Sequence, residues 1–142
     1  MKLFFDTNVI IDALTERDVS YKASRRLINY VLENKVKGYI ASKQITDIYY
    51  ILKKYTSSEE QRLAIVRLIL KTFEVMPTLK SDIAYCVNNY NGMDLEDFLI
   101  DEICKVNCIN CLVTENIKDF KNAETQVMTP KQICDLLEIE EN

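Results

Sequence analysis

The sequence predicts an α/β fold, a three-layer α/β/α sandwich with a central, mostly parallel sheet of about five strands. Short apolar segments alternate along the chain with segments whose apolar residues recur at helical spacing. The first of these segments is apolar throughout, as in a parallel strand buried on both faces. With 142 residues and 48% hydrophobic content, the chain can bury one core, and we expect a single domain over residues 1–142.

The first strand and the helix after it organise the rest of the chain. The apolar residues 3–5 lead directly into Asp6, and the sequence Asp-Thr-Asn that follows is typical of helix caps. Asp6 is therefore expected at the carboxyl end of a central strand, where open α/β sheets form their ligand crevice. Simple capping of the helix is the competing explanation for this residue.

The later elements follow the same alternation. We expect further strands at residues 39–41, 73–76, 110–114 and 126–128. Helices are expected over residues 21–32, 42–54 (capped by Ser42), 57–73, 81–90 and 94–106. Thr129 and Pro130 are the residues expected to start the last helix.

Composition excludes several classes of function. The chain has no histidine, which excludes His-based acid–base catalysis and Ser-His-Asp or Cys-His sites. A net charge of −4 argues against generic polyanion binding. Five cysteines, an odd number, favour reduced thiols over disulfides, although Cys104, Cys108 and Cys111 have a spacing that metal sites also use. Without a signal peptide or membrane span, we expect a cytoplasmic protein that binds no membrane.

Acidic residues recur just after predicted strands or early in helices. Asp6, Asp47 and Asp97 come from three such junctions, and the loop from Glu115 to Asp119 comes from a fourth. In a parallel sheet these positions share one edge, so the carboxylates can converge. Clustered carboxylates raise one another's pKa, and a divalent cation stabilises them in the ionised form. An all-oxygen site suits Mg²⁺ or Mn²⁺, and the chemistry it favours is phosphodiester hydrolysis.

The helix expected to begin near residue 94 carries further acids. Asp94, Asp97 and Asp101 are spaced along one side of it, where like charges repel unless a cation or partner relieves them. Asp94 and Glu96 are secondary site candidates, and the competing explanation for both is that acids in a first helical turn gain from the helix dipole. Asp101 lies beyond that turn, and we expect it at the surface.

These segments together resemble the PIN domain, and most closely the VapC-type toxin ribonucleases of toxin–antitoxin pairs. The resemblance rests on the apolar-Asp-Thr-Asn opening at residues 3–12, on Ser42 with an acid five residues later, and on residues 94–99 and 112–120. It implies a PIN-like fold and an Mg²⁺- or Mn²⁺-dependent endoribonuclease acting on RNA and leaving a 5′-phosphate. It also implies a homodimer and inhibition by a small cognate antitoxin.

The resemblance implies a role for individual residues as well. The residues that match the catalytic and metal-binding acids are Asp6, Asp47 and Asp97. The residues that match polar groups orienting the acids or the substrate are Thr7, Asn8, Thr114 and Asn116.

Two residues depart from the family pattern. The family usually has Glu where this chain has Asp47, which favours coordination through a water. Asn116 stands where many members have a fourth acid, so Glu115 and Asp119 are candidate substitutes. These departures leave open a second function, that of a catalytically inactive PIN-fold module for protein interaction. Phosphoryl transfer through Asp6 is a third, but a haloacid-dehalogenase-type enzyme would need a second Asp where Asn8 stands.

Overall fold

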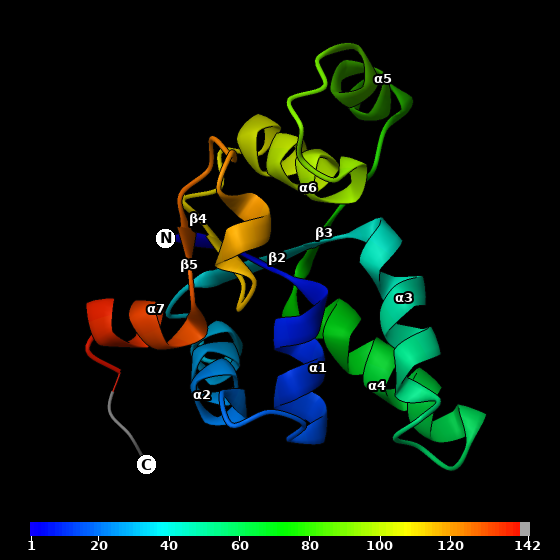
Figure 1. Ribbon diagram of the computed structural model, residues 1–142. Helices are drawn as coiled ribbons and strands as arrows, with labels where there is room; N and C mark the ends of the chain where they lie inside the picture. Colours follow the sequence, from blue (N-terminus) through cyan, green and yellow to red (C-terminus); the bar gives the residue numbers. More distant parts are fainter. Residues whose placement is uncertain (140–142) are drawn as a thin grey trace.

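The computed structural model describes residues 1–139, and a five-stranded parallel sheet lies at its centre (Figure 1). Its strands are β1 (Lys2–Phe5), β2 (Lys37–Ala41), β3 (Glu74–Met76), β4 (Cys111–Val113) and β5 (Val127–Met128). The helices are α1 (Thr7–Thr15), α2 (Tyr21–Leu32), α3 (Ser42–Leu52), α4 (Glu59–Thr72), α5 (Lys80–Asn88), α6 (Leu95–Val106), the 3₁₀ helix η1 (Ile117–Phe120) and α7 (Pro130–Leu136).

The strand order, β3-β2-β1-β4-β5, puts the first strand in the middle of the sheet. β1 pairs with β2 on one side and with β4 on the other, so the chain winds away from β1 in both directions. In such sheets a ligand crevice lies beyond the carboxyl ends of the two strands at which the order reverses. These strands are β1 and β4, which end at Phe5 and Val113.

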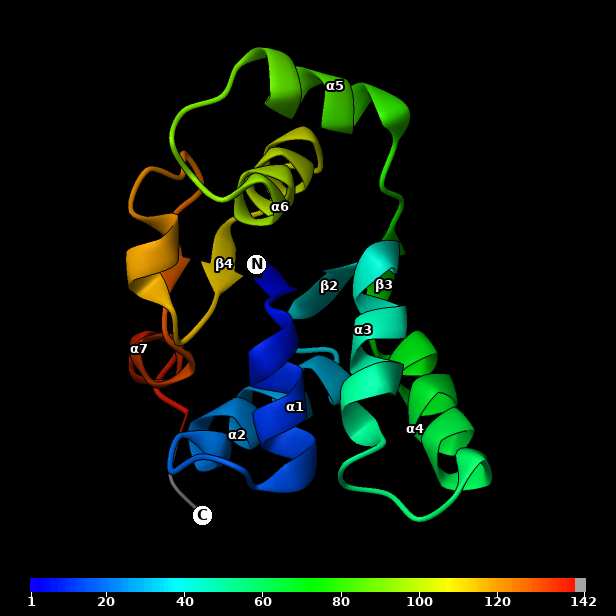
Figure 2. The same ribbon diagram turned by 45° about the vertical axis from the view of Figure 1, so that its right-hand side comes forward.

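Helices cover both faces of the sheet (Figures 1 and 2). Successive strand residues point to opposite faces. Leu3 and Phe5 accordingly pack with the core under α1, α2, α3, α4 and α7, whereas Phe4 packs with the core under α5, α6 and η1. None of the three has exposed surface. The predicted three-layer α/β/α fold with a parallel sheet is confirmed.

Every predicted strand and helix is present, with bounds that differ by a few residues. Thr129 caps α7 as expected, through a hydrogen bond from the Gln132 N–H to its hydroxyl (3.1 Å). The start of α3 differs, because Ser42 is its first residue and the Gln44 side chain accepts the Ala41 N–H (2.6 Å). Each helix within residues 1–139 is too short or too polar to traverse a lipid bilayer.

The three cysteines with metal-site spacing lie in different surroundings. Cys111 is buried in the core that contains Leu3, and Cys104 is buried in the core on the opposite face of the sheet. Cys108 is exposed.

The surface position expected for Asp101 is wrong. This residue is only 1% exposed, and its two carboxylate oxygens accept the backbone N–H groups of Glu124 (2.9 Å) and Thr125 (3.0 Å). A carboxylate can be buried in this way because hydrogen bonds replace its hydration. Asp101 therefore anchors the segment that follows η1 onto α6, and it helps to fix where η1 lies.

Candidate active site

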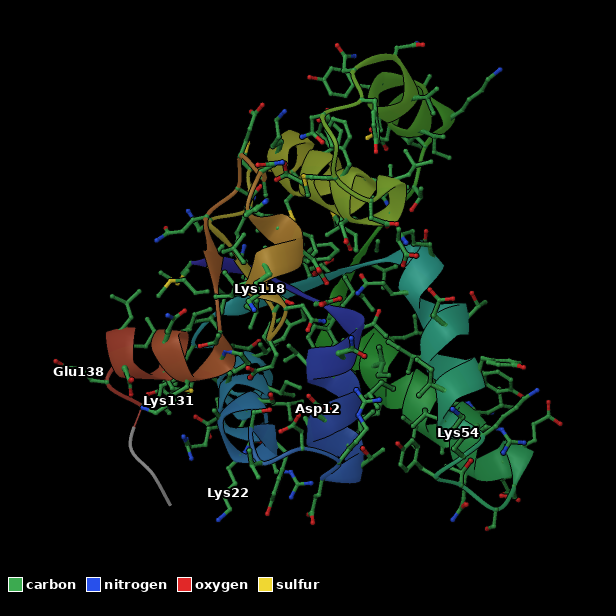
Figure 3. All side chains as sticks on the ribbon, viewed as in Figure 1. Asp12, Lys22, Lys54, Lys118, Lys131 and Glu138 are labelled. Carbon is green, nitrogen blue, oxygen red and sulfur yellow. The ribbon has the colours of Figure 1, made fainter. Side chains whose placement is uncertain are left out.

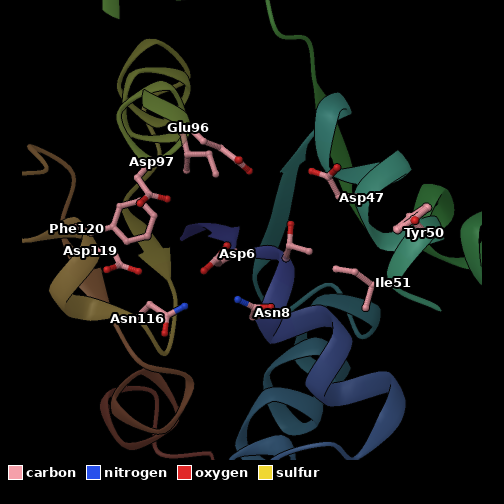
Figure 4. A pocket seen from close by; sticks show the side chains of 12 residues that line it. Asp6, Asn8, Asp47, Tyr50, Ile51, Glu96, Asp97, Asn116, Asp119 and Phe120 are labelled. Atoms are coloured by element: carbon pink, nitrogen blue, oxygen red, sulfur yellow. The ribbon is translucent and has the colours of Figure 1, made fainter. Parts of the chain in front are cut away.

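A cavity opens at the carboxyl edge of the sheet, beyond the ends of β1 and β4, and its volume is about 460 Å³. We call it the acidic cavity; Figure 4 shows the side chains around it. Its lining residues come from β1–α1, α3, α6 and the β4–η1 segment: Asp6, Thr7, Asn8, Asp47, Tyr50, Ile51, Glu96, Asp97, Ile100, Asn116, Asp119 and Phe120.

Asp6 occupies the turn between β1 and α1, and its N–H donates to the Val113 carbonyl at the end of β4 (2.9 Å). Its carboxylate makes no capping hydrogen bond to α1. Instead, Oδ2 accepts the hydroxyl of the fully buried Thr114 (2.8 Å), and that hydroxyl accepts the Asn116 N–H (3.0 Å). Helix capping therefore does not account for Asp6, whose carboxylate is held at the acidic cavity.

Gln44 is a residue of this site that the sequence interpretation missed. It is 1% exposed, and its amide donates to the Phe5 carbonyl (2.9 Å) and to the Thr7 hydroxyl (3.2 Å). Its Oε1 accepts the Ala41 N–H at the end of β2. Gln44 thus joins the ends of two adjacent strands to the first residue of α1. A Gln at the third position of a helix, directly after an apolar strand, is the signal that would have found it.

Asp97, in the first turn of α6, and Asp119, on η1, face Asp6 from the other side of the acidic cavity (Figure 4). Burial, followed by the negative charges of Asp94, Asp119, Asp6 and Glu96, raises the pKa of Asp97 to about 6. Burial also raises the pKa of Asp6. Within residues 1–139, no Lys or Arg forms an ion pair with Asp6, Asp97 or Asp119. The negative charge of these three aspartates is therefore not compensated by any cation in the described part of the chain.

The comparison with known families agrees with this geometry. The sequence profile of the PIN domain matches residues 2–118. The chain belongs to the PIN-domain family. This match confirms the resemblance inferred from the sequence motifs.

Known proteins similar to this PIN domain include a ribonuclease and toxin–antitoxin complexes. It is 30% identical over 138 residues to "Ribonuclease VapC1" of Aquifex aeolicus (strain VF5), and the match covers 94% of each chain. A toxin–antitoxin complex from Klebsiella pneumoniae has 24% identity and a TM-score of 0.66, covering 90% of this chain and 97% of that chain. VapBC2 from Rickettsia felis, bound to a promoter DNA fragment, has 19% identity and a TM-score of 0.65, covering 91% and 98%. At these identities the two structures show a shared fold.

Two further acids line the acidic cavity of this PIN domain. Asp47 is exposed on α3 and lies on the wall opposite Asp97 (Figure 4). Glu96 also lines the cavity, but Lys43 forms an ion pair with its carboxylate (2.9 Å). Asp47 has no such partner in the described part of the chain, so its charge adds to that of the cavity.

The remaining candidates divide by position. Asp94 caps α6, since its carboxylate accepts the N–H groups of Glu96 (3.0 Å) and Asp97 (3.4 Å). Glu115 lies outside the acidic cavity and lines a separate one near the start of α2. Asp119 does line the acidic cavity, so it is the one of the two candidate substitutes that lies near Asp6.

The donor set of the acidic cavity fits a hard divalent cation. Among residues 1–139, no three or more Asp, Glu or Cys side chains lie close enough to enclose a metal ion by themselves. Mg²⁺ does not require this, because it keeps several waters and typically binds one or two carboxylates. Asp6 and Asp97 form no ion pair among residues 1–139, and the pKa values of their carboxyl groups are raised. A bound cation would lower these pKa values. Their chemistry therefore suits Mg²⁺ or Mn²⁺.

Proposed function

We propose that this protein is a metal-dependent endoribonuclease that acts as the toxin of a type II toxin–antitoxin pair. The observation that carries the proposal is the gathering of Asp6, Asp97 and Asp119 at one cavity without a cationic partner in the described part of the chain. The pKa values of Asp6 and Asp97 are raised, and uncompensated carboxylates of this kind are characteristic of functional sites. The similarity to a ribonuclease over 94% of both chains supports RNA as the substrate.

In this proposal Asp6, Asp97 and Asp47 are the catalytic acids. Asp6 and Asp97 would hold Mg²⁺ or Mn²⁺, and the shorter, exposed Asp47 would be the third acid of the metal site. The metal, when bound, lowers the pKa of a water molecule and neutralises the phosphodiester. Asp119 faces Asp6 and Asp97 and accepts the proton that the attacking water loses.

The polar residues of the site orient the catalytic acids and the RNA. Thr114 holds the Asp6 carboxylate by its hydroxyl, and Gln44 holds the Thr7 hydroxyl. Thr7, Asn8 and Asn116 line the acidic cavity and supply neutral hydrogen-bonding groups for the RNA phosphate and ribose. Attack on phosphorus with departure of the ribose 3′-oxygen leaves the 5′-phosphate that the family resemblance implies.

We further infer two protein partners, a second copy of the chain and a small antitoxin. Apolar side chains remain exposed on two separate helices, Leu63, Leu68 and Leu70 on α4 and Ile83 and Val87 on α5, and each helix is a candidate interface. Contiguous exposed apolar surface is characteristic of protein interfaces. Light scattering of the purified chain tests the dimer, and co-purification with the product of an adjacent short reading frame tests the antitoxin. We place the protein in the cytoplasm, where its free cysteines stay reduced.

The deciding experiment is RNA cleavage by the purified chain, free of any bound protein. Cleavage that stops with EDTA, returns with Mg²⁺ or Mn²⁺ and is lost in Asp6→Asn is the expected result. Asp135→Asn is the matched control, because it makes the same charge change at an exposed position on α7. If wild-type protein cleaves none of a broad set of RNAs, including structured transfer and ribosomal RNAs, the proposal is wrong.

The second candidate function is a catalytically inactive PIN-fold interaction module. The observations that favour it are the exposed position of Asp47 and the presence of Asn116 where many family members have an acid. A module of this kind predicts a stable partner complex that is unaffected by Asp6→Asn, together with a wild-type chain that cleaves no RNA.

A further inference from the structure

The turn after α1 brings Arg17 back toward the acidic cavity. α1 ends at Thr15, and Glu16 adopts a left-handed conformation (φ 54°) with its N–H bonded to the Asp12 carbonyl (2.9 Å). This reversal directs Arg17 along the face of α1 that carries both Asn8 and Asp12, which are four residues apart. Its Nε donates to Asp12 Oδ1 (2.9 Å), and its Nη2 donates to Asn8 Oδ1 (3.1 Å).

The ion pair fixes the guanidinium. The Asp12 side chain is 5% exposed and the Arg17 side chain 31%, and Asp12 lies midway along α1 (Figure 3). Charge-assisted hydrogen bonds of partly buried groups are stronger than neutral surface contacts. Because a guanidinium is planar, its bond to Asp12 also sets the direction in which Nη2 points.

That direction decides the orientation of the Asn8 amide. A carboxamide has an oxygen acceptor on one side and an NH₂ donor on the other, whereas Arg has donors only. Asn8 Oδ1 must therefore face Arg17, and the NH₂ group must face the opposite way. In Figure 4 the nitrogen of Asn8 accordingly points into the acidic cavity, on the side of Asp6 and Asn116.

A donor at this position is chemically significant. The acidic cavity is lined by four aspartates and Glu96, which present oxygen acceptors to an anionic substrate. The NH₂ group of Asn8 can donate to a non-bridging phosphate oxygen, whereas a flipped amide would add one more acceptor against it.

We propose that Arg17 is a positioning residue, which holds the Asn8 carboxamide so that its NH₂ group donates to the scissile phosphodiester of RNA. The inference rests on the proposed ribonuclease function. It assigns Asn8 the direct contact with the substrate and Arg17 an effect through Asn8 alone.

The first test is a measurement of the Asn8 side chain itself by NMR. The side-chain NH₂ resonances of Asn8 are assigned by their loss in Asn8→Ala. Arg17→Lys keeps a cation for Asp12 but lacks the second N–H that reaches Asn8, so these resonances are expected to shift. Arg25→Lys is the matched control, because Arg25 also packs on α1 but bonds the Ala13 carbonyl and Glu16. Unchanged Asn8 resonances in Arg17→Lys would overturn the proposal.

The second test is RNA cleavage with single and double variants. We expect Arg17→Lys to lower kcat/KM about tenfold, and to have no further effect in an Asn8→Ala background. Additive losses would mean that Arg17 acts independently of Asn8, against the proposal. If wild type cleaves no RNA, the proposed function fails by itself, and the NMR measurement still decides whether Arg17 orients Asn8.

Asn8→Asp separates folding from chemistry. The substitution is isosteric, and the new carboxylate pairs with Arg17, which offsets the charge that it adds to the acidic cavity, so the variant is expected to fold with a melting temperature close to that of wild type. It removes the donor, and kcat/KM is expected to fall at least as far as in Asn8→Ala. Full activity of Asn8→Asp would refute the role assigned to the NH₂ group.

Discussion

The substitution Asp97→Asn is expected to stabilise the metal-free protein at neutral pH. Burial and neighbouring acids raise the pKa of Asp97 from 3.8 to about 6, so its ionised form is disfavoured in the folded state. An asparagine side chain at this position would keep the shape of the aspartate and remove its charge. The acidic cavity thus predicts an unusual result, in which loss of a proposed catalytic residue makes the fold more stable.

The magnitude follows from the pKa shift. A shift of that size corresponds to about 3 kcal/mol as an upper bound. Asp97 is partly exposed, and solvent screening reduces the expected gain to about 1 kcal/mol. For a domain of this length, this gain raises the melting temperature by about 3 °C.

The sign of the pH dependence provides a second check. Because the folded state binds the Asp97 proton more tightly than the unfolded chain, this group stabilises the fold fully below its ordinary pKa of 3.8. That contribution is lost as the pH rises through about 6. The difference between Asp97→Asn and wild type is therefore largest near neutral pH and disappears near pH 4.

Thermal and urea unfolding in EDTA, at several pH values, measures this difference. Asp135→Asn is the matched control: Asp135 is exposed and paired with Lys131, so its substitution should change stability by less than about 0.5 kcal/mol. Added Mg²⁺ is expected to stabilise wild type more than Asp97→Asn. A destabilised Asp97→Asn at neutral pH, or a gain that persists unchanged to pH 4, would refute the reasoning.

Three other substitutions test separate features. Asp101→Ala leaves the buried Thr125 N–H and the partly buried Glu124 N–H without an acceptor, and it is expected to cost about 3 kcal/mol in urea unfolding. A loss below about 1 kcal/mol would contradict the anchoring role. Tyr50, which lines the acidic cavity and is 70% exposed, can stack on a base of the RNA. In an Asp6→Asn background, Tyr50→Ala is therefore expected to weaken RNA binding about tenfold. Tyr90→Ala is the control and should leave RNA binding unchanged, because Tyr90 is similarly exposed (67%) but lies outside the cavity. Gly38→Ala would place a Cβ 2.8 Å from the Phe73 ring and is expected to lower the free energy of unfolding by about 2 kcal/mol. A melting temperature equal to that of wild type would contradict this expectation.

The features predictable from sequence are those that depend on short-range pattern and on topology. The uninterrupted apolar run at residues 3–5 indicates a strand buried on both faces, and its three side chains do fill both cores. Once the strands are parallel, residues that follow them must share one edge. Asp6, Asp47 and Asp119 follow β1, β2 and β4 and line the acidic cavity, and Asp97 joins them because α6 begins at the same edge.

The features that sequence reasoning missed depend on where loops fold. Asp101 is buried because the segment around Glu124 and Thr125, more than twenty residues later, packs against α6. No local sequence pattern predicts that contact. Gln44 reaches Thr7 across two adjacent strand ends, a contact that depends on strand order. Arg17 reaches Asn8 only because Glu16 is left-handed, a conformation that the sequence does not signal at a non-glycine residue.

The three residues that follow β1 are each held by a polar side chain from a different direction. Thr114 holds Asp6 (2.8 Å), Gln44 holds Thr7 (3.2 Å) and Arg17 holds Asn8 (3.1 Å). Repulsion among the carboxylates favours spreading of this turn, and the three hydrogen bonds oppose it. Because the three partners belong to separate elements, loss of one leaves the other two in place. Thr114→Val and Arg17→Lys are therefore expected to impair RNA cleavage more than they impair folding. Gln44→Leu also removes the bonds to the Ala41 N–H and the Phe5 carbonyl, so it is expected to lower the melting temperature as well as the rate of cleavage.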